Sequence, residues 1–212
     1  MEEVYRSQEG IINSASQNSY LIDMTTTTPT LSVKIHEEAK KKNLKALDAP
    51  VSGGDIGAKN ATLSIMVGGE KEDFEACKKL FEAMGKTIVY AGNAGSGQHT
   101  KMANQIAIAG VMAGVSEAIA YGKKMGLDIP TMLASISNGA AQSFHLTNNA
   151  PKMYKREFEP GFYIKHMVKD LKIANEEMPN LKVLKDVLEI YETLEKNGDG
   201  DLGTQAICKY YE

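Results

Sequence analysis

The stretch Gly95-Ser96-Gly97-Gln98-His99-Thr100-Lys101-Met102-Ala103-Asn104-Gln105 decides the fold, because it joins two differently patterned halves of the chain. Gly95 and Gly97 permit unusual backbone angles and a close approach of other segments. A run of apolar and small residues follows and predicts a long helix over 97–124. This helix is nearly apolar all round, which is typical of a helix buried on most sides.

Polar side chains are grouped at the start of the predicted helix. Lys101, Asn104 and Gln105 stand at positions i, i+3 and i+4, so they share one face. In one interpretation Lys101 extends to solvent and Asn104 caps a neighbouring group. In the other, the lysine is a proton donor and the two amides orient a substrate in a cleft. The spacing by itself leaves both interpretations open.

The residues before position 95 predict an α/β arrangement. Short apolar runs favour strands, and periodic segments favour helices between them, which together indicate βαβ units. With about four strands, the sheet is smaller than the usual five or six. Thr27 or Thr28 is expected to cap the first helix, with Pro29 in its first turn. Residues 1–19 are polar and weakly patterned. The expected strands cover 20–24, 46–51, 63–69 and 87–90, and the expected helices cover 30–42 and 72–84.

The pattern changes after residue 94, where helices alone are predicted. Glycine and proline residues separate them. We therefore expect two domains, an α/β domain over 1–94 and an all-α domain over 95–212, with the long helix as the joint. The expected helices cover 97–124, 130–137, 142–154, 165–178 and 181–196.

Composition narrows the class of protein. The 212 residues are 42% hydrophobic and 24% charged with a net charge of −3, which favours a soluble globular protein over a nucleic-acid-binding one.

No apolar run is expected to reach the length of a membrane span, and no secretory signal is visible. Cys77 and Cys208 lie far apart, as expected of a reduced, cytoplasmic protein. The four histidines form no metal-binding pair, so no metal is expected.

The chain resembles the β-hydroxyacid dehydrogenase family, which includes 3-hydroxyisobutyrate dehydrogenase, tartronate semialdehyde reductase and the glyoxylate/succinic semialdehyde reductases. The matching segments follow the family's order and spacing across nearly the whole chain. The resemblance implies a partial Rossmann-type sheet joined by a long helix to an all-helical domain. The segments are Leu-Ile-Asp-Met-Thr-Thr-Thr-Thr-Pro (21–29), Asp-Ala-Pro-Val-Ser-Gly-Gly (48–54), Thr-Leu-Ser-Ile-Met-Val-Gly-Gly (62–69), Gly-x-Gly-x-x-x-Lys-x-x-Asn-Gln (95–105) and Lys-Asp-Leu (169–171).

The resemblance also implies an activity: hydride transfer between NADP or NAD and a small carboxylate-bearing aldehyde or β-hydroxyacid. Lys101 would be the catalytic proton donor, and Gln105 is typical of the semialdehyde-reductase branch. The implied substrate-binding residues are Ser52, Gly53, Gly54, Asn104 and Gln105, and the implied cofactor-binding residues are Thr26, Lys169 and Asp170.

Each implied role has a local alternative. Gly53-Gly54 also suits an ordinary turn after a strand. The threonines also suit a helix cap. Lys169 and Asp170 also suit a solvent-exposed pair, since adjacent residues do not face each other on a helix.

One feature of the family is absent. No G-x-G-x-x-G occurs, and the nearest stretch, 92–97, lacks the rest of the dinucleotide fingerprint. The resemblance therefore implies a chain without the front of the cofactor domain. A second hypothesis is a non-catalytic fragment that acts only in oligomerisation through its helical half. The partners implied are a small substrate and further copies of the chain in a homodimer or homotetramer, with no nucleic acid and no membrane.

Overall fold

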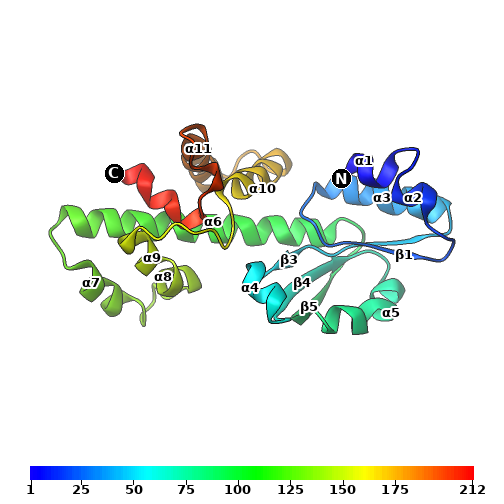
Figure 1. Ribbon diagram of the computed structural model, residues 1–212, viewed down its shortest axis with the longest axis horizontal. Helices are drawn as coiled ribbons and strands as arrows, with labels where there is room; N and C mark the ends of the chain where they lie inside the picture. Colours follow the sequence, from blue (N-terminus) through cyan, green and yellow to red (C-terminus); the bar gives the residue numbers. More distant parts are fainter. The chain divides into compact units, whose positions relative to one another are not determined.

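A computed structural model describes all residues, 1–212, and it divides into two compact units. The first is Met1–Ala103 and the second is Asn104–Glu212. The division falls inside the long helix α6 (Ser96–Lys124) rather than at residue 94. Figure 1 labels the α-helices and most of the strands.

The first unit contains a mixed five-stranded sheet. β1 pairs with β2 in parallel and β4 pairs with β5 in parallel, whereas β4 is antiparallel to β2 and β3. The second expected strand is split into β2 and β3 at Pro50, which has no N–H for the ladder. Its carbonyl still accepts a bond of 3.0 Å from the Met66 N–H. The strands are β1 (Tyr20–Asp23), β2 (Lys45–Asp48), β3 (Val51–Ser52), β4 (Leu63–Gly68) and β5 (Gly85–Gly92).

The helices of this unit include the two that were expected. α3 begins as predicted, because the Thr28 hydroxyl accepts a 3.3 Å bond from the Leu31 N–H and Pro29 occupies the first turn. Two short helices, α1 and α2, form in the weakly patterned region 1–19, and α4 forms after Gly53, where no helix was predicted. The helices are α1 (Glu2–Arg6), α2 (Ile11–Ser14), α3 (Pro29–Lys41), α4 (Gly54–Lys59) and α5 (Lys71–Glu82).

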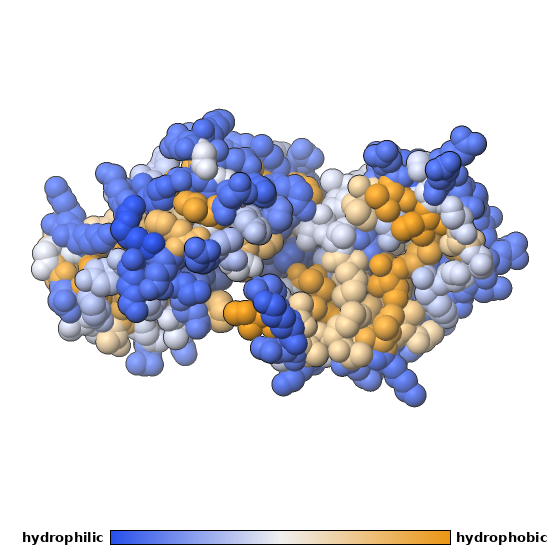
Figure 2. Space-filling model, viewed as in Figure 1, coloured by the Kyte–Doolittle hydropathy of each residue, from blue (hydrophilic) through white to orange (hydrophobic).

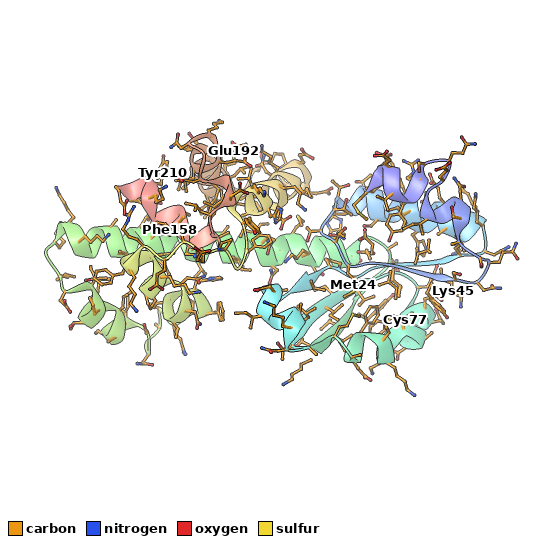
Figure 3. The ribbon with its side chains drawn as sticks, viewed as in Figure 1. Met24, Lys45, Cys77, Phe158, Glu192 and Tyr210 are labelled. Carbon is orange, nitrogen blue, oxygen red and sulfur yellow. The ribbon has the colours of Figure 1, made fainter.

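Alternation along the strands produces two apolar layers. Leu21 and Ala46 belong to a cluster that includes residues of α1, α2 and α3. The next residue of β2, Leu47, belongs to a second cluster with residues of β4 and α5, because successive side chains on a strand point to opposite faces. Met24 and Cys77 lie on this second side (Figure 3). Orange, apolar side chains gather over the strands in Figure 2.

The second unit is helical, with one isolated β-bridge between Tyr163 and Gly203. The expected helix over 142–154 is two helices, because Pro151 fits only the first turn of a helix. The chain ends in two 3₁₀ helices, η1 (Asp199–Asp201) and η2 (Thr204–Tyr211). Besides α6, the helices are α7 (Ile129–Ile136), α8 (Phe144–Asn148), α9 (Ala150–Lys155), α10 (Ile164–Glu177) and α11 (Lys182–Lys196).

The core of this unit forms around α10, α11 and η2. Tyr191 is fully buried, and its hydroxyl donates a 3.1 Å hydrogen bond to the Thr204 carbonyl at the start of η2. Leu171 and Ile207 are also fully buried. The side-chain amide of Gln205 donates to the carbonyls of Glu157 and Glu159 at 3.0 and 2.9 Å, which holds η2 to the segment before α10.

Helix α6 is long and apolar enough to cross a membrane by length and composition alone. The expectation that no apolar run reaches that length is therefore wrong. Buried core helices of soluble proteins have the same property, so the observation by itself assigns no membrane.

Candidate functional site

The beginning of α6 is anchored by Asp48, the last residue of β2. Its Oδ1 accepts a hydrogen bond of 2.8 Å from the Gly95 N–H, and its Oδ2 accepts one of 2.9 Å from the Gln98 N–H. The first N–H groups of a helix have no partner within the helix, and the helix dipole favours a negative charge there. Burial raises the pKa of the Asp48 carboxyl, and these N–H groups partly offset the rise.

Two glycines at the beginning of α6, one just before the helix and one in its first turn, allow this close contact. A Cβ on Gly97 would lie 2.5 Å from the Met66 carbonyl oxygen and 2.6 Å from that of Asp48. Gly95 has a φ of +89°, a conformation that side chains rarely adopt. Both predicted properties of these glycines, close approach and unusual backbone angles, are therefore observed.

Gln98 connects α6 to the threonine loop, residues 25–28, which follows β1. Its side chain is fully buried. Its Nε2 donates to the Thr25 carbonyl at 2.8 Å, and its Oε1 accepts from the Thr27 N–H at 3.2 Å. The two bonds hold the backbone on either side of Thr26, the predicted cofactor-binding residue.

Lys101 lies on α6, one turn after Gln98, and only 6% of it is exposed. The interpretation in which this lysine extends into solvent is therefore wrong. Lysine side chains are rarely buried, so the burial of Lys101 makes it a candidate functional residue.

Three of the predicted substrate-binding residues, Ser52, Gly53 and Gly54, lie in the same unit. Ser52 ends β3, and Gly53 and Gly54 have φ values of +133° and +63°. Both glycines are solvent-exposed and Ser52 is half-buried, so the loop is open to a small molecule. The structure shows a glycine turn that leads into α4, and its role toward a substrate stays a prediction.

The second unit brings the remaining predicted residues into one chain of contacts. Asn104 Nδ2 donates to Gln105 Oε1 at 2.9 Å, and Gln105 Nε2 donates to Asp170 Oδ2 at 2.7 Å. The other carboxylate oxygen of Asp170 lies 2.9 Å from Lys169 Nζ in an ion pair. Asp170 is 1% exposed, whereas about half of the Lys169 side chain is in solvent.

This chain of contacts changes how two of the predictions are understood. The oxygen and the nitrogen of the Gln105 side-chain amide are both bonded within the protein and the residue is buried, so Gln105 holds Asn104 and Asp170, and its direct contact with a substrate stays a prediction. Lys169 and Asp170 are more than a solvent-exposed pair, because Asp170 is buried and bonded to a second helix.

Two residues of the site had no individual role predicted from the sequence. Asp48 lies inside a family-like segment, and the available signal was an acidic residue at the end of a buried strand. Gln98 lies among the glycines of the helix start, where a large polar residue is unexpected. Because the partners of both residues lie about 50 to 73 positions away, local spacing did not reveal them.

No group of three or more His, Cys, Asp or Glu side chains in residues 1–212 is arranged to hold a metal ion.

Comparisons with known proteins decide the family. The family model for the NAD-binding domain of 6-phosphogluconate dehydrogenase matches residues 1–92. The model for the NAD-binding domain of NADP-dependent 3-hydroxyisobutyrate dehydrogenase matches residues 95–211. The chain belongs to the β-hydroxyacid dehydrogenase family. The two matches meet next to the glycines that precede α6.

Individual relatives agree with this assignment. The uncharacterized oxidoreductase YkwC of Bacillus subtilis is 56% identical over 100% of this chain and 75% of its own length. A probable mitochondrial 3-hydroxyisobutyrate dehydrogenase-like protein of Arabidopsis thaliana is 42% identical over 94% of this chain and 61% of its own length. The chain thus spans about three fifths to three quarters of the length of these two relatives.

A solved structure shows the same fold. The 3-hydroxyisobutyrate dehydrogenase of Mycobacterium tuberculosis, solved with L-serine, superposes with a TM-score of 0.86 at 27% identity. The match covers 93% of this chain and 72% of that one. The comparisons together place the chain among NAD(P)-dependent hydroxyacid dehydrogenases.

Proposed function

We propose that this chain transfers a hydride between NAD(P)H and a small carboxylate-bearing aldehyde or β-hydroxyacid, of the 3-hydroxyisobutyrate, tartronate semialdehyde or succinic semialdehyde class. The observation that carries the proposal is the buried Lys101 on the anchored first turns of α6. Membership of a hydroxyacid dehydrogenase family supports it.

The threonine loop fits a nicotinamide cofactor. It follows the carboxyl end of β1, which is parallel to β2, and ligands of α/β sheets bind outside the carboxyl ends of parallel strands. When bound, the reduced cofactor supplies the hydride. Thr26 would contact it from this loop. For Lys169 and Asp170 a role toward the cofactor is implied by the family resemblance, and their ion pair orients the lysine side chain.

Lys101 would supply the proton. As an ammonium, it polarises the carbonyl of the aldehyde and stabilises the negative charge that develops on the oxygen. It then donates a proton to that oxygen, which completes the alcohol and leaves a neutral amine that solvent reprotonates. In the oxidation direction the neutral amine accepts the proton of the hydroxyl group.

The substrate carboxylate would be held by the loop after β3. Ser52 has a hydroxyl donor, and the positive φ values of Gly53 and Gly54 allow backbone N–H groups to turn toward an anion. Asn104 lies on α6 one turn after Lys101, where its amide would orient the substrate. Gln105 would act behind it by holding that amide.

The experiment that tests this function compares matched substrates. We expect oxidation of NADPH or NADH with succinic semialdehyde, and a kcat/KM at least tenfold lower with butanal, which has no carboxylate. Ser52→Ala should reduce this preference by raising KM for the semialdehyde alone. Equal rates with both aldehydes would contradict the proposed carboxylate site.

We also propose a homodimer or homotetramer. In support, α6 exposes the apolar side chains of Val111 and Tyr121. Analytical ultracentrifugation should show a sedimenting species of two or four chains, and a monomer at micromolar concentration would contradict this. If the chain acted only in oligomerisation, as the second hypothesis states, ultracentrifugation would show the oligomer and calorimetry would detect no binding of NADPH or NADH.

A cytoplasmic location is proposed from the state of the cysteines. Cys77 and Cys208 are both buried and neither forms a disulfide, which suits a reducing compartment. Fractionation of cells that express a tagged chain should recover it in the cytoplasmic fraction, and recovery with membranes would contradict the proposal.

A further inference from the structure

The side-chain amide of Gln98 makes the contacts that a neighbouring strand would make. It donates to the Thr25 carbonyl and accepts from the Thr27 N–H, at 2.8 and 3.2 Å. Gln98 and Thr27 are both buried, so losing the second bond would leave the Thr27 N–H without a partner away from water. The loop after β1 is therefore bonded to α6 on both sides of Thr26.

The helix that carries Gln98 is itself held in place. The backbone N–H of Gln98 donates to Asp48 at 2.9 Å, so this one residue is bound to the end of β2 through its backbone and to the threonine loop through its side chain. Lys101 follows one helical turn later on α6. The loop, the strand end and the lysine-bearing turn are thereby joined at a single residue.

We propose that Gln98 is a positioning residue for hydride transfer, which sets the threonine loop at a fixed place relative to the Lys101 turn of α6. The inference rests on the proposed function. Hydride and proton must reach the carbon and the oxygen of the same carbonyl group, so an error of about 1 Å between the groups that hold the cofactor and the proton donor lowers the rate by about 10²-fold.

Two substitutions separate this role from a merely structural one. Gln98→Met keeps the length of the side chain and removes both hydrogen bonds. Gln98→Glu keeps both bonds only while the carboxyl is protonated, when its O–H donates to Thr25 and its carbonyl accepts from Thr27. The ionised form has no donor for the Thr25 carbonyl.

The expected results follow from these bonds. In Gln98→Met, kcat should fall about 10²-fold at every pH. In Gln98→Glu, kcat relative to that of the unsubstituted chain should rise as the pH falls from 8 to 5. His99→Met, at the exposed next position of α6, should stay within about twofold of the unsubstituted chain.

A second readout does not depend on activity. Hydrogen exchange of the Thr27 amide should become faster in Gln98→Met and remain slow in His99→Met. Unchanged protection of Thr27 in Gln98→Met, or a kcat equal to that of the unsubstituted chain, would overturn the proposal. If the unsubstituted chain transferred no hydride, the proposed function and the catalytic part of this inference would fail together, while the exchange data would still decide the anchoring of the loop.

Discussion

Gln105 Nε2 donates a hydrogen bond of 2.7 Å to Asp170 Oδ2, and both side chains are buried. The bond joins α6 to α10 within the second unit. Because Gln105 Oε1 also accepts from Asn104, the glutamine fixes the direction of the Asn104 amide. We infer that Gln105 supports Asn104, the proposed substrate-orienting residue, and does not itself contact the substrate.

Gln105→Leu should therefore destabilise the protein. It leaves the Asp170 carboxylate without a buried donor, which is expected to lower the free energy of unfolding by about 1–3 kcal/mol. Urea denaturation measures this, and Gln142→Leu, at an exposed position, is a matched control with an expected change below about 0.5 kcal/mol. A stable Gln105→Leu variant with only a raised substrate KM would show direct substrate contact instead.

Gly97→Ala should disturb the anchored start of α6. The added methyl group would meet the backbone carbonyls of Met66 and Asp48 at 2.5 and 2.6 Å, so the helix start must shift. We expect a loss of about 1–3 kcal/mol in stability and a lower kcat. Gly114→Ala on the same helix is the control, since a Cβ there has no atom within 4 Å and a gain of up to about 1 kcal/mol is expected. Equal melting temperatures for the two variants would contradict the close contact at Gly97.

His145 should make stability depend on pH. Burial lowers the pKa of its imidazole below the ordinary value of 6.5, and Asn149 Nδ2 lies 2.8 Å from Nδ1, where it can donate to the neutral ring. The unfolded chain then binds a proton more readily than the folded one. The contribution of His145 to stability is therefore complete above pH 6.5 and is lost as the pH falls through the lower, folded-state pKa.

Unfolding free energies of the unsubstituted chain and of His145→Gln, measured between pH 8 and pH 5, test this dependence. The unsubstituted chain should lose stability relative to the variant as the pH falls. Parallel curves for the two proteins would show that His145 is not responsible.

Tyr191→Phe should weaken the packing of η2 on α11. The substitution keeps the buried ring and removes the donor to the Thr204 carbonyl, so the free energy of unfolding should fall by about 1 kcal/mol. Thermal denaturation would show the change. A variant as stable as the parent would mean that another group satisfies the Thr204 carbonyl.

The sequence predicted the elements whose signal is local. Apolar runs marked the strands, and the capping role of Thr28 follows from the residues beside it. The short helices α1 and α2 were missed because they contribute only Tyr5 and Ile12 to the core. The split between β2 and β3 depends on the single missing N–H of Pro50.

The candidate site was predicted only in part, for a related physical reason. Lys101 stood out because it stands with two amide side chains at the start of an apolar helix, and resemblance to a family implied its role. The partners of Asp48, Gln98 and Gln105 are set by tertiary packing. No local sequence pattern indicates that a glutamine amide faces a distant loop or a buried aspartate. These hydrogen bonds could therefore be identified only from the structure.

The most direct test of the central claim is the kcat of Lys101→Ala for reduction of a carboxylate-bearing semialdehyde, measured with and without added methylammonium. If Lys101 donates the proton, kcat should fall by about 10²–10⁴-fold, cofactor affinity should be kept, and the added amine should restore part of the rate. A variant with a near-normal kcat, or one that the amine does not rescue, would contradict the role assigned to Lys101.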